Sequence, residues 1–171
     1  VQLPNVISAS RFVLSALITL TITQQLWLVS GGLFLLAVAS DLVDGALARR
    51  RDQVTKIGGL IDHAADATFV TVTITCMALQ QDRSLLLPIL IILAFAQYVL
   101  DSQAHRGQRL IASSLGRYNG IGYFLFAGAL LLAEVIPPPS LWGDALMLAY
   151  WALILTTVLS ILDRGFAQRQ S

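Results

Sequence analysis

The chain has 171 residues, of which 56% are hydrophobic and only 12% are charged. A soluble domain usually carries about 25% charged residues, so this composition argues against a water-soluble globular protein. The high hydrophobicity excludes a disordered chain, and the formal charge of +1 excludes a strongly basic nucleic-acid-binding protein. The single cysteine, Cys76, cannot form an internal disulfide or a zinc site. Function is therefore expected from polar residues on membrane helices.

Six apolar segments alternate with short polar connectors, and a membrane-spanning helix needs roughly 20 apolar residues. The sequence predicts an all-α fold, a single-domain bundle of six transmembrane helices over residues 1–171. The first segment lacks the pattern of a cleavable signal peptide and is expected to remain. The predicted helices cover about 5–24, 27–48, 58–80, 85–103, 116–135 and 141–163.

Breaker residues are expected in the connectors between these helices. The polar segment 21–25 separates the first two helices, and Gly58–Gly59 precedes the third. The remaining connectors contain the polar cluster 80–84, then Gly107, and then the prolines 137–139.

The basic residues are distributed very unevenly. Six spans put both termini and the loops near 49–57 and 104–117 on one side of the membrane, and only Arg83 falls on the other side. Basic loops face the cytoplasm, so both termini are predicted to be cytoplasmic, in a bacterial inner membrane, with the site facing the cytoplasm. The residues on that side are Arg11, Arg49, Arg50, Arg51, Lys56, Arg106, Arg109, Arg117, Arg164 and Arg169.

Four aspartates lie near this basic side of the second and third helices. Asp41 and Asp44 are three residues apart, and Asp62 and Asp66 are four apart, so each pair shares one helix face. The short loop makes the two helices antiparallel neighbours, and the four carboxylates are expected to converge. A carboxylate without a partner at membrane depth costs several kcal/mol, so this cluster requires a cation.

Three interpretations fit the acid cluster. Arg49, Arg50 and Arg51 could neutralise it in a salt-bridged helix hairpin. A proton or sodium pathway is a second interpretation, although it predicts acids spread through the membrane depth. Carboxylate oxygens also suit Mg²⁺ or Mn²⁺, and two such ions could hold both oxygens of a phosphoryl displacement.

Small residues accompany the acids on the same helix faces. Gly45 and Ala48 follow Asp41 by four and seven residues, and Gly58 precedes Asp62 by four. Small side chains would leave a slot for an extended ligand beside the acids. Close helix packing explains the same pattern.

The segment from Asp41 to Asp66 reads D-L-V-D-G-A-L-A-R, eight further residues, and G-G-L-I-D-H-A-A-D. It resembles, at every defined position, the signature of the CDP-alcohol phosphotransferase family, D-x-x-D-G-x-x-A-R, eight residues, G-x-x-x-D-x-x-x-D. The segment 4–11 is also similar to the P-N-x-x-T/S-x-x-R segment of that family. Six predicted helices agree with the architecture of the family.

The resemblance implies a membrane transferase of phospholipid biosynthesis, and a homodimer. Such an enzyme moves a substituted phosphate from a CDP-linked lipid, here CDP-diacylglycerol, to an acceptor hydroxyl and releases CMP. Two Mg²⁺ or Mn²⁺ ions would be held by Asp41, Asp44, Asp62 and Asp66, with Asp66 also the base that takes the hydroxyl proton. The donor nucleotide and diphosphate would lie against Asn5, Ser8, Arg11, Asp44, Gly45, Ala48, Arg49 and Gly58.

Arg106, Arg109 and Arg117 are the candidate acceptor-binding residues. Arginine binds phosphate through a fork of donors, which favours a phosphorylated acceptor such as glycerol 3-phosphate. The same residues could serve only membrane topology and contacts with anionic lipids. Inositol phosphate, serine or another polar alcohol is the second expectation, and an ion-translocating protein is the third.

Overall fold

Six α-helices form the regular structure of the described chain. The structure is a computed structural model that describes residues 3–50, 56–102, 113–136 and 141–168, with side chains for 8–43, 58–102, 113–136 and 141–165. Within these ranges it contains helices and no strands, which confirms the all-α fold. The helices are α1 (Leu3–Thr23), α2 (Trp27–Arg50), α3 (Lys56–Gln80), α4 (Leu86–Asp101), α5 (Ser114–Val135) and α6 (Trp142–Gln168).

Two connectors between the helices turn at a residue with positive φ. Gln25 has a φ of 58° and ends the α1 segment, and Asp82 has a φ of 50° after α3. This left-handed conformation cannot continue a right-handed helix, so the chain reverses direction there. α1 and α3 therefore end within the polar segments 21–25 and 80–84, as predicted.

α3 starts two residues before the predicted start near 58, and Gly58 and Gly59 do not break the helix. α3 begins at Lys56, so both glycines lie inside its first turn instead of in the connector. A glycine within a helix costs only about 0.5–1 kcal/mol relative to alanine, which tertiary packing of α3 can offset. α6 continues to Gln168, beyond the predicted end at 163. The prediction followed the apolar pattern, which ends near 163, whereas the helix continues through the polar residues that follow. Gly107 and the prolines 137–139 lie outside the described residues.

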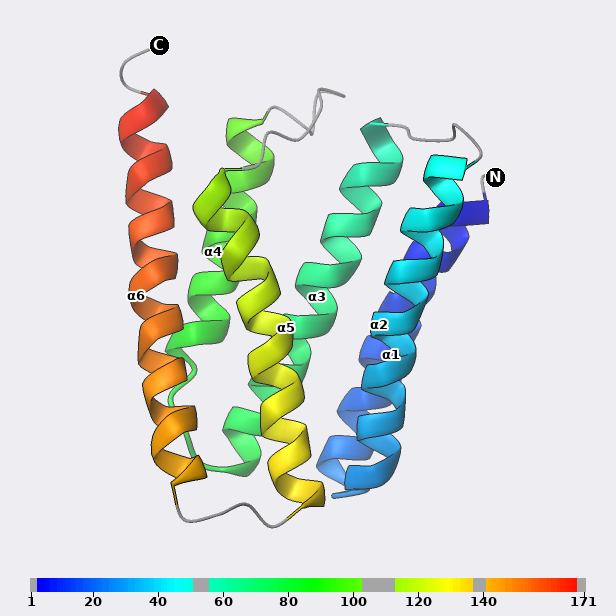
Figure 1. Cartoon of the computed structure of the whole chain (residues 1–171), viewed down its shortest axis with the longest axis vertical. Helices are drawn as coiled ribbons and strands as arrows, with labels where there is room; N and C mark the ends of the chain where they lie inside the picture. Colours follow the sequence, from blue (N-terminus) through cyan, green and yellow to red (C-terminus); the bar gives the residue numbers. More distant parts are fainter. Residues whose placement is uncertain (1–2, 51–55, 103–112, 137–140, 169–171) are drawn as a thin grey trace.

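α3 occupies the centre of the bundle (Figure 1). It packs against α1, α4 and α5, while α2 packs against α1 and α5, and α6 packs against α4 and α5. α1, α3 and α5 begin, and α2, α4 and α6 end, at the same end of the bundle (Figure 1). Asp41, Asp62 and Asp66 belong to this end, which we call the acid end.

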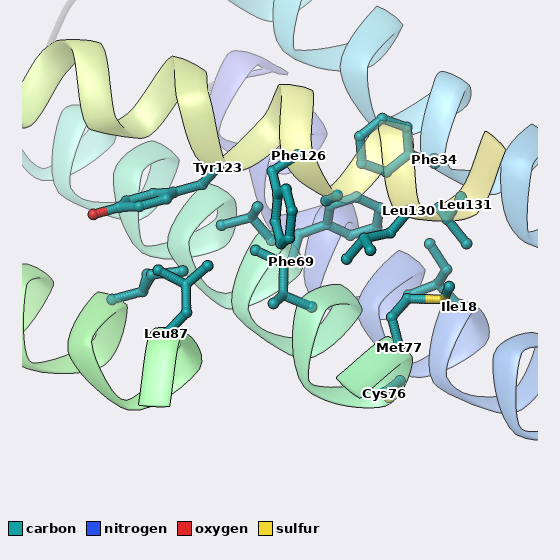
Figure 2. Packing of buried hydrophobic residues seen from close by; sticks show 14 of the residues in the cluster. Ile18, Phe34, Phe69, Cys76, Met77, Leu87, Tyr123, Phe126, Leu130 and Leu131 are labelled. Carbon is teal, nitrogen blue, oxygen red and sulfur yellow. The ribbon is translucent and has the colours of Figure 1, made fainter. Parts of the chain in front are cut away.

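The apolar core lies between α3 and its neighbours. The rings of Phe34 in α2, Phe69 in α3 and Phe124 in α5 form a triangle with centroid distances of 5.9, 6.2 and 6.5 Å. Figure 2 shows the surrounding side chains, which come from α1, α3, α4 and α5: Ile18, Met77, Leu87, Phe126, Leu130 and Leu131. Interlocking aromatic and aliphatic groups thus fix the position of α3 relative to α1, α2, α4 and α5.

The outer surface of the bundle is also apolar. Leu28, Leu125 and Leu148 are 77%, 71% and 73% exposed, and many other large apolar side chains on α1, α2, α4, α5 and α6 face outward. The helical segments Ser114–Val135 and Trp142–Gly165 are long and apolar enough to cross a membrane. Shorter apolar helical segments cover Ser8–Thr23, Trp27–Val43 and Leu86–Asp101. Two spans are thus supported by length and composition, and the six-span arrangement stays a prediction.

Gly128 is a close contact between α5 and the aromatic core. A Cβ atom there would lie 3.0 Å from Cε1 of Phe34, whereas a Cβ at Gly32 would meet nothing within 4 Å. We expect Gly128→Leu to lower the free energy of unfolding by about 1–3 kcal/mol, because the Phe34 ring must move in a packed core. Thermal unfolding in detergent, followed by tryptophan fluorescence, measures the effect. Gly32→Leu is the matched control, and equal melting temperatures for both variants would contradict this packing.

Candidate active site at the acid end

The buried guanidinium of Arg11 lies against three carboxylates. Its Nη1 donates to Asp41 Oδ1 at 2.6 Å and lies 3.1 Å from Asp66 Oδ1. Its Nη2 donates to Asp62 Oδ1. The arginine side chain is 0% exposed, although it carries a full positive charge. A guanidinium presents five N–H donors in a fixed fork, so one side chain can bind carboxylates from two helices.

The packing of α1 explains this arrangement. α1 contacts both α2, which carries Asp41, and α3, which carries Asp62 and Asp66. Ser8 lies one turn before Arg11 and donates to the same Asp62 Oδ1, at 3.2 Å. The structure therefore brings together three of the four predicted aspartates, and it does so around a residue of the first helix.

The ion pairs leave the carboxylates partly open. The side chains of Asp41, Asp62 and Asp66 are 42%, 31% and 23% exposed. Removing one partner of a buried ion pair usually costs about 3–5 kcal/mol, because the other charge is left uncompensated. Arg11 thus supplies charge compensation. One of the three sequence interpretations gave this role to Arg49, Arg50 and Arg51, whose side chains lie outside the described residues.

The acid end has the donor atoms that a divalent cation requires. One ligand atom each from Asp62, His63 and Asp66 lies within 4.8 Å of the others. Carboxylate oxygens are the ligands that Mg²⁺ and Mn²⁺ prefer, and an aspartate bonded to Arg11 through Oδ1 retains further lone pairs. Nδ1 of His63 is 3.8 Å from Asp62 Oδ2, and this imidazole is about half exposed. The observed donor set therefore fits an oxygen-rich cation site beside Arg11.

A second group of side chains extends the acid end toward α4 and α6. The His63 ring lies 5.9 Å from the ring of Tyr98, and the guanidinium carbon of Arg164 lies 4.8 Å from the centroid of the same tyrosine ring. The positive charge of Arg117 also interacts electrostatically with the hydroxyl group of Tyr98. Arg164 and Tyr98 belong to no sequence motif, so only the packing of α4 against α6 identifies them.

For several other predicted site residues, the structure describes only the backbone or does not describe the residue. Asn5, Asp44, Gly45, Ala48 and Arg49 lie on the helical backbones of α1 and α2, and their side chains are outside the described residues. Gly58 lies in the first turn of α3, at the acid end. Arg117 is exposed near the start of α5, whereas Arg106 and Arg109 lie outside the described residues.

The sequence matches the family model named CDP-alcohol phosphatidyltransferase over residues 1–162. The chain belongs to this family. The family match covers the helices that bear Arg11 and the aspartates, so the resemblance seen in the signature extends over nearly the whole chain.

Two relatives of known name are similar to the chain. One is the cardiolipin synthase (CMP-forming)/mitochondrial hydrolase fusion protein of Schizosaccharomyces pombe, 30% identical over 97% of this chain and 27% of the relative. The other is the CDP-diacylglycerol–glycerol-3-phosphate 3-phosphatidyltransferase of Aquifex aeolicus, 37% identical over 40% of this chain and 38% of the relative. The matched regions thus span about a quarter to two fifths of these relatives.

Proposed function

We propose that the protein transfers a phosphatidyl group from CDP-diacylglycerol to a hydroxyl of glycerol 3-phosphate and releases CMP. The observation that carries this proposal is the convergence of Asp41, Asp62 and Asp66, three defined positions of the family signature, at one partly open end of the bundle. Family membership favours the same reaction class. An enzyme of this kind would act in phospholipid biosynthesis.

Asp66 is the proposed catalytic base. The acceptor oxygen attacks the phosphorus that carries the diacylglycerol, the bond from this phosphorus to the CMP oxygen breaks, and CMP leaves with the electron pair. The proton of the acceptor hydroxyl passes to the Asp66 carboxylate. Positioning and charge neutralisation dominate the catalysis of such in-line displacements, so the protein mainly has to hold the two substrates in register.

The proposed cation ligands are Asp41, Asp44, Asp62 and Asp66. Two bound Mg²⁺ or Mn²⁺ ions would supply charge neutralisation for the diphosphate and for the charge that develops in the transition state. The partly exposed carboxylates of Asp41, Asp62 and Asp66 support this assignment, because both cations and substrates need access.

The proposed donor site lies beside the cation ligands at the ends of α1, α2 and α3. Arg49 would bind the diphosphate through its guanidinium fork, and Gly45, Ala48 and Gly58 would leave room for the nucleotide. Asp44 would also face the cytidine. From α1, Asn5, Ser8 and Arg11 would approach the same phosphates.

We further propose that all six helices span a membrane and that both termini lie on the cytoplasmic side of a bacterial inner membrane. The outward-facing leucines, which occur on all six helices, support burial of the bundle in lipid. The basic residues near the acid end support its cytoplasmic orientation. A homodimer is proposed from the family resemblance.

The relative matched over 97% of this chain favours a second candidate acceptor, because its printed name is cardiolipin synthase (CMP-forming). Cardiolipin carries two phosphatidyl groups on one glycerol, so its CMP-forming synthesis needs a glycerol hydroxyl that is already part of a lipid. The chemistry at phosphorus would be unchanged. Only the acceptor site would differ between the two candidates.

CMP release tests the proposal directly. Detergent-purified protein is incubated with CDP-diacylglycerol, Mg²⁺ and one acceptor at a time, and CMP and the lipid product are quantified. We expect release with glycerol 3-phosphate, loss of release after chelation, and recovery on addition of Mg²⁺ or Mn²⁺. Release only with phosphatidylglycerol would favour the second candidate, and absence of release with every acceptor would overturn the transferase assignment.

Asp66→Asn tests the catalytic base. The amide keeps the size of the side chain but has neither its charge nor its proton affinity, so CMP release should fall by about 10²–10⁴-fold. Folding should be largely retained because Asp41 and Asp62 still pair with Arg11. Asp144→Asn, an exposed change at the start of α6, is the matched control. Turnover within a few-fold of the unmodified protein would exclude Asp66 as the base.

Alanine substitutions of the candidate acceptor-binding arginines should change the KM for the acceptor and leave the KM for the donor nearly unchanged. A charge-assisted hydrogen bond is worth about 1.5–3 kcal/mol, so Arg106→Ala, Arg109→Ala or Arg117→Ala should raise the KM for glycerol 3-phosphate roughly ten- to a hundredfold. The KM for CDP-diacylglycerol should barely change. Arg83→Ala, at the opposite end of the bundle, is the control. Parallel changes in both constants, or no change, would assign these arginines to membrane topology instead.

A further inference from the structure

The full burial of Arg11 among partly exposed acids is the starting observation. Arg11 is 0% exposed and contacts Asp41, Asp62 and Asp66. One guanidinium thus forms ion pairs with carboxylates of two helices, α2 and α3. The guanidinium therefore links α1 to α2 and α3 by charged hydrogen bonds, in addition to the packing of these helices.

The charges at the acid end are unequal. Three aspartates face one arginine, so the described cluster carries net negative charge, and Asp44 would add a fourth carboxylate. Like charges a few ångströms apart repel strongly where water is partly excluded. Without Arg11, the carboxylates of α2 and α3 would have to separate or take up protons or cations.

We propose that Arg11 is a positioning residue, an internal counter-cation that holds the α2 and α3 carboxylates together before a divalent cation binds. Arg11 and the divalent cation both place positive charge beside the same carboxylates. Each therefore reduces the stabilisation free energy that the other contributes. The metal-free protein thus keeps its acid end assembled, and it binds the cation more weakly than the acids alone would. This inference rests on the proposed function for the location of the cation.

The coupling between Arg11 and the cation is what distinguishes this role from simple structural stabilisation. A side chain that only fills space would contribute equally to the metal-free and the metal-bound protein. A counter-cation contributes more to the metal-free protein, so its removal must tighten cation binding by the same coupling free energy. The inference therefore predicts a loss of stability that Mg²⁺ repairs.

The experiment compares melting temperatures of the full chain in detergent, with chelator and with saturating Mg²⁺, for the unmodified protein, Arg11→Met and Arg11→Lys. We expect the metal-free melting temperature of Arg11→Met to fall by roughly 5–15 °C, because a buried ion pair loses one partner. Mg²⁺ should restore at least about half of that loss. The Mn²⁺ dissociation constant, followed by electron paramagnetic resonance of the free ion, should fall about tenfold.

Arg11→Lys keeps the charge but loses the planar fork that reaches three carboxylates. Its metal-free melting temperature and its Mn²⁺ affinity should therefore lie between those of the unmodified protein and Arg11→Met. If Arg11→Met does not fold without metal, the double variant Arg11→Met/Asp41→Asn removes part of the repulsion and should regain stability in chelator. A double variant no more stable than the single one would overturn the counter-cation role.

Two controls separate this effect from general destabilisation. Tyr123→Phe removes the hydrogen bond between Tyr123 Oη and Thr157 Oγ1, 2.6 Å long, and should lower stability without changing the Mg²⁺-induced shift. Arg83→Met removes an exposed arginine from the opposite end and should change neither quantity. An Mg²⁺-induced shift in Arg11→Met equal to or smaller than that of the unmodified protein would overturn the inference.

The outcomes also separate this inference from the proposed function. A larger Mg²⁺-induced shift in Arg11→Met supports the counter-cation role even if no acceptor yields CMP, a result that would overturn only the transferase assignment. An active transferase whose Arg11→Met variant binds Mn²⁺ no more tightly keeps its proposed function and loses this inference. A raised KM for CDP-diacylglycerol with unchanged Mn²⁺ affinity would leave Arg11 only the donor contact proposed above and likewise overturn the inference.

Discussion

The ion pairs of Arg11 connect three helices at the acid end, and the arrangement of the proposed active site depends on them. α2 and α3 bring carboxylates that repel one another, and α1 brings the charge that compensates them. A buried ion pair of this kind contributes little net stability compared with an apolar core, but its geometry is specific. The aromatic contacts of Phe34, Phe69 and Phe124 supply apolar packing that stabilises the bundle. The charged residues of the acid end can therefore serve binding rather than stability.

The position of α3 links the core to the acid end. Its middle and C-terminal turns are buried through Phe69, Ile74 and Met77, and its N-terminal turns carry Asp62 and Asp66. α4 and α5 also pack against α3. Because the central helix is held along most of its length, its two carboxylates are presented from a rigid support, as precise chemistry requires.

Helix content and helix order could be predicted from the sequence because apolar segments and breakers alternate clearly. The spacing of Asp62 and Asp66 also predicted a shared face, since it depends only on helix geometry. The start of α3 was placed too late because a glycine pair is a weak helix breaker when packing compensates for it. The counter-ions of the acids were sought in divalent cations or in Arg49, Arg50 and Arg51, which are close in sequence, and Arg11 was placed only near the donor phosphates.

The contacts of Arg11, and of Arg164 with Tyr98, depend on which helices pack together. Sequence spacing within one helix carries no information on that packing, so neither contact could be derived from it. The cation count, the donor contacts and the roles of Arg106, Arg109 and Arg117 stay predictions.

The tight turn at Gln25 has a consequence for biosynthesis. α1 and α2 form a helical hairpin, and Ser30 Oγ donates to Thr21 Oγ1 at 2.8 Å next to the turn. Arg11 and Asp41 both belong to this hairpin, so their ion pair can form before α3 has been synthesised. A paired charge enters a bilayer at lower cost than two separate charges. If α1 and α2 span the membrane as proposed, this pairing would let the hairpin insert as one unit and offer a preformed docking face to α3.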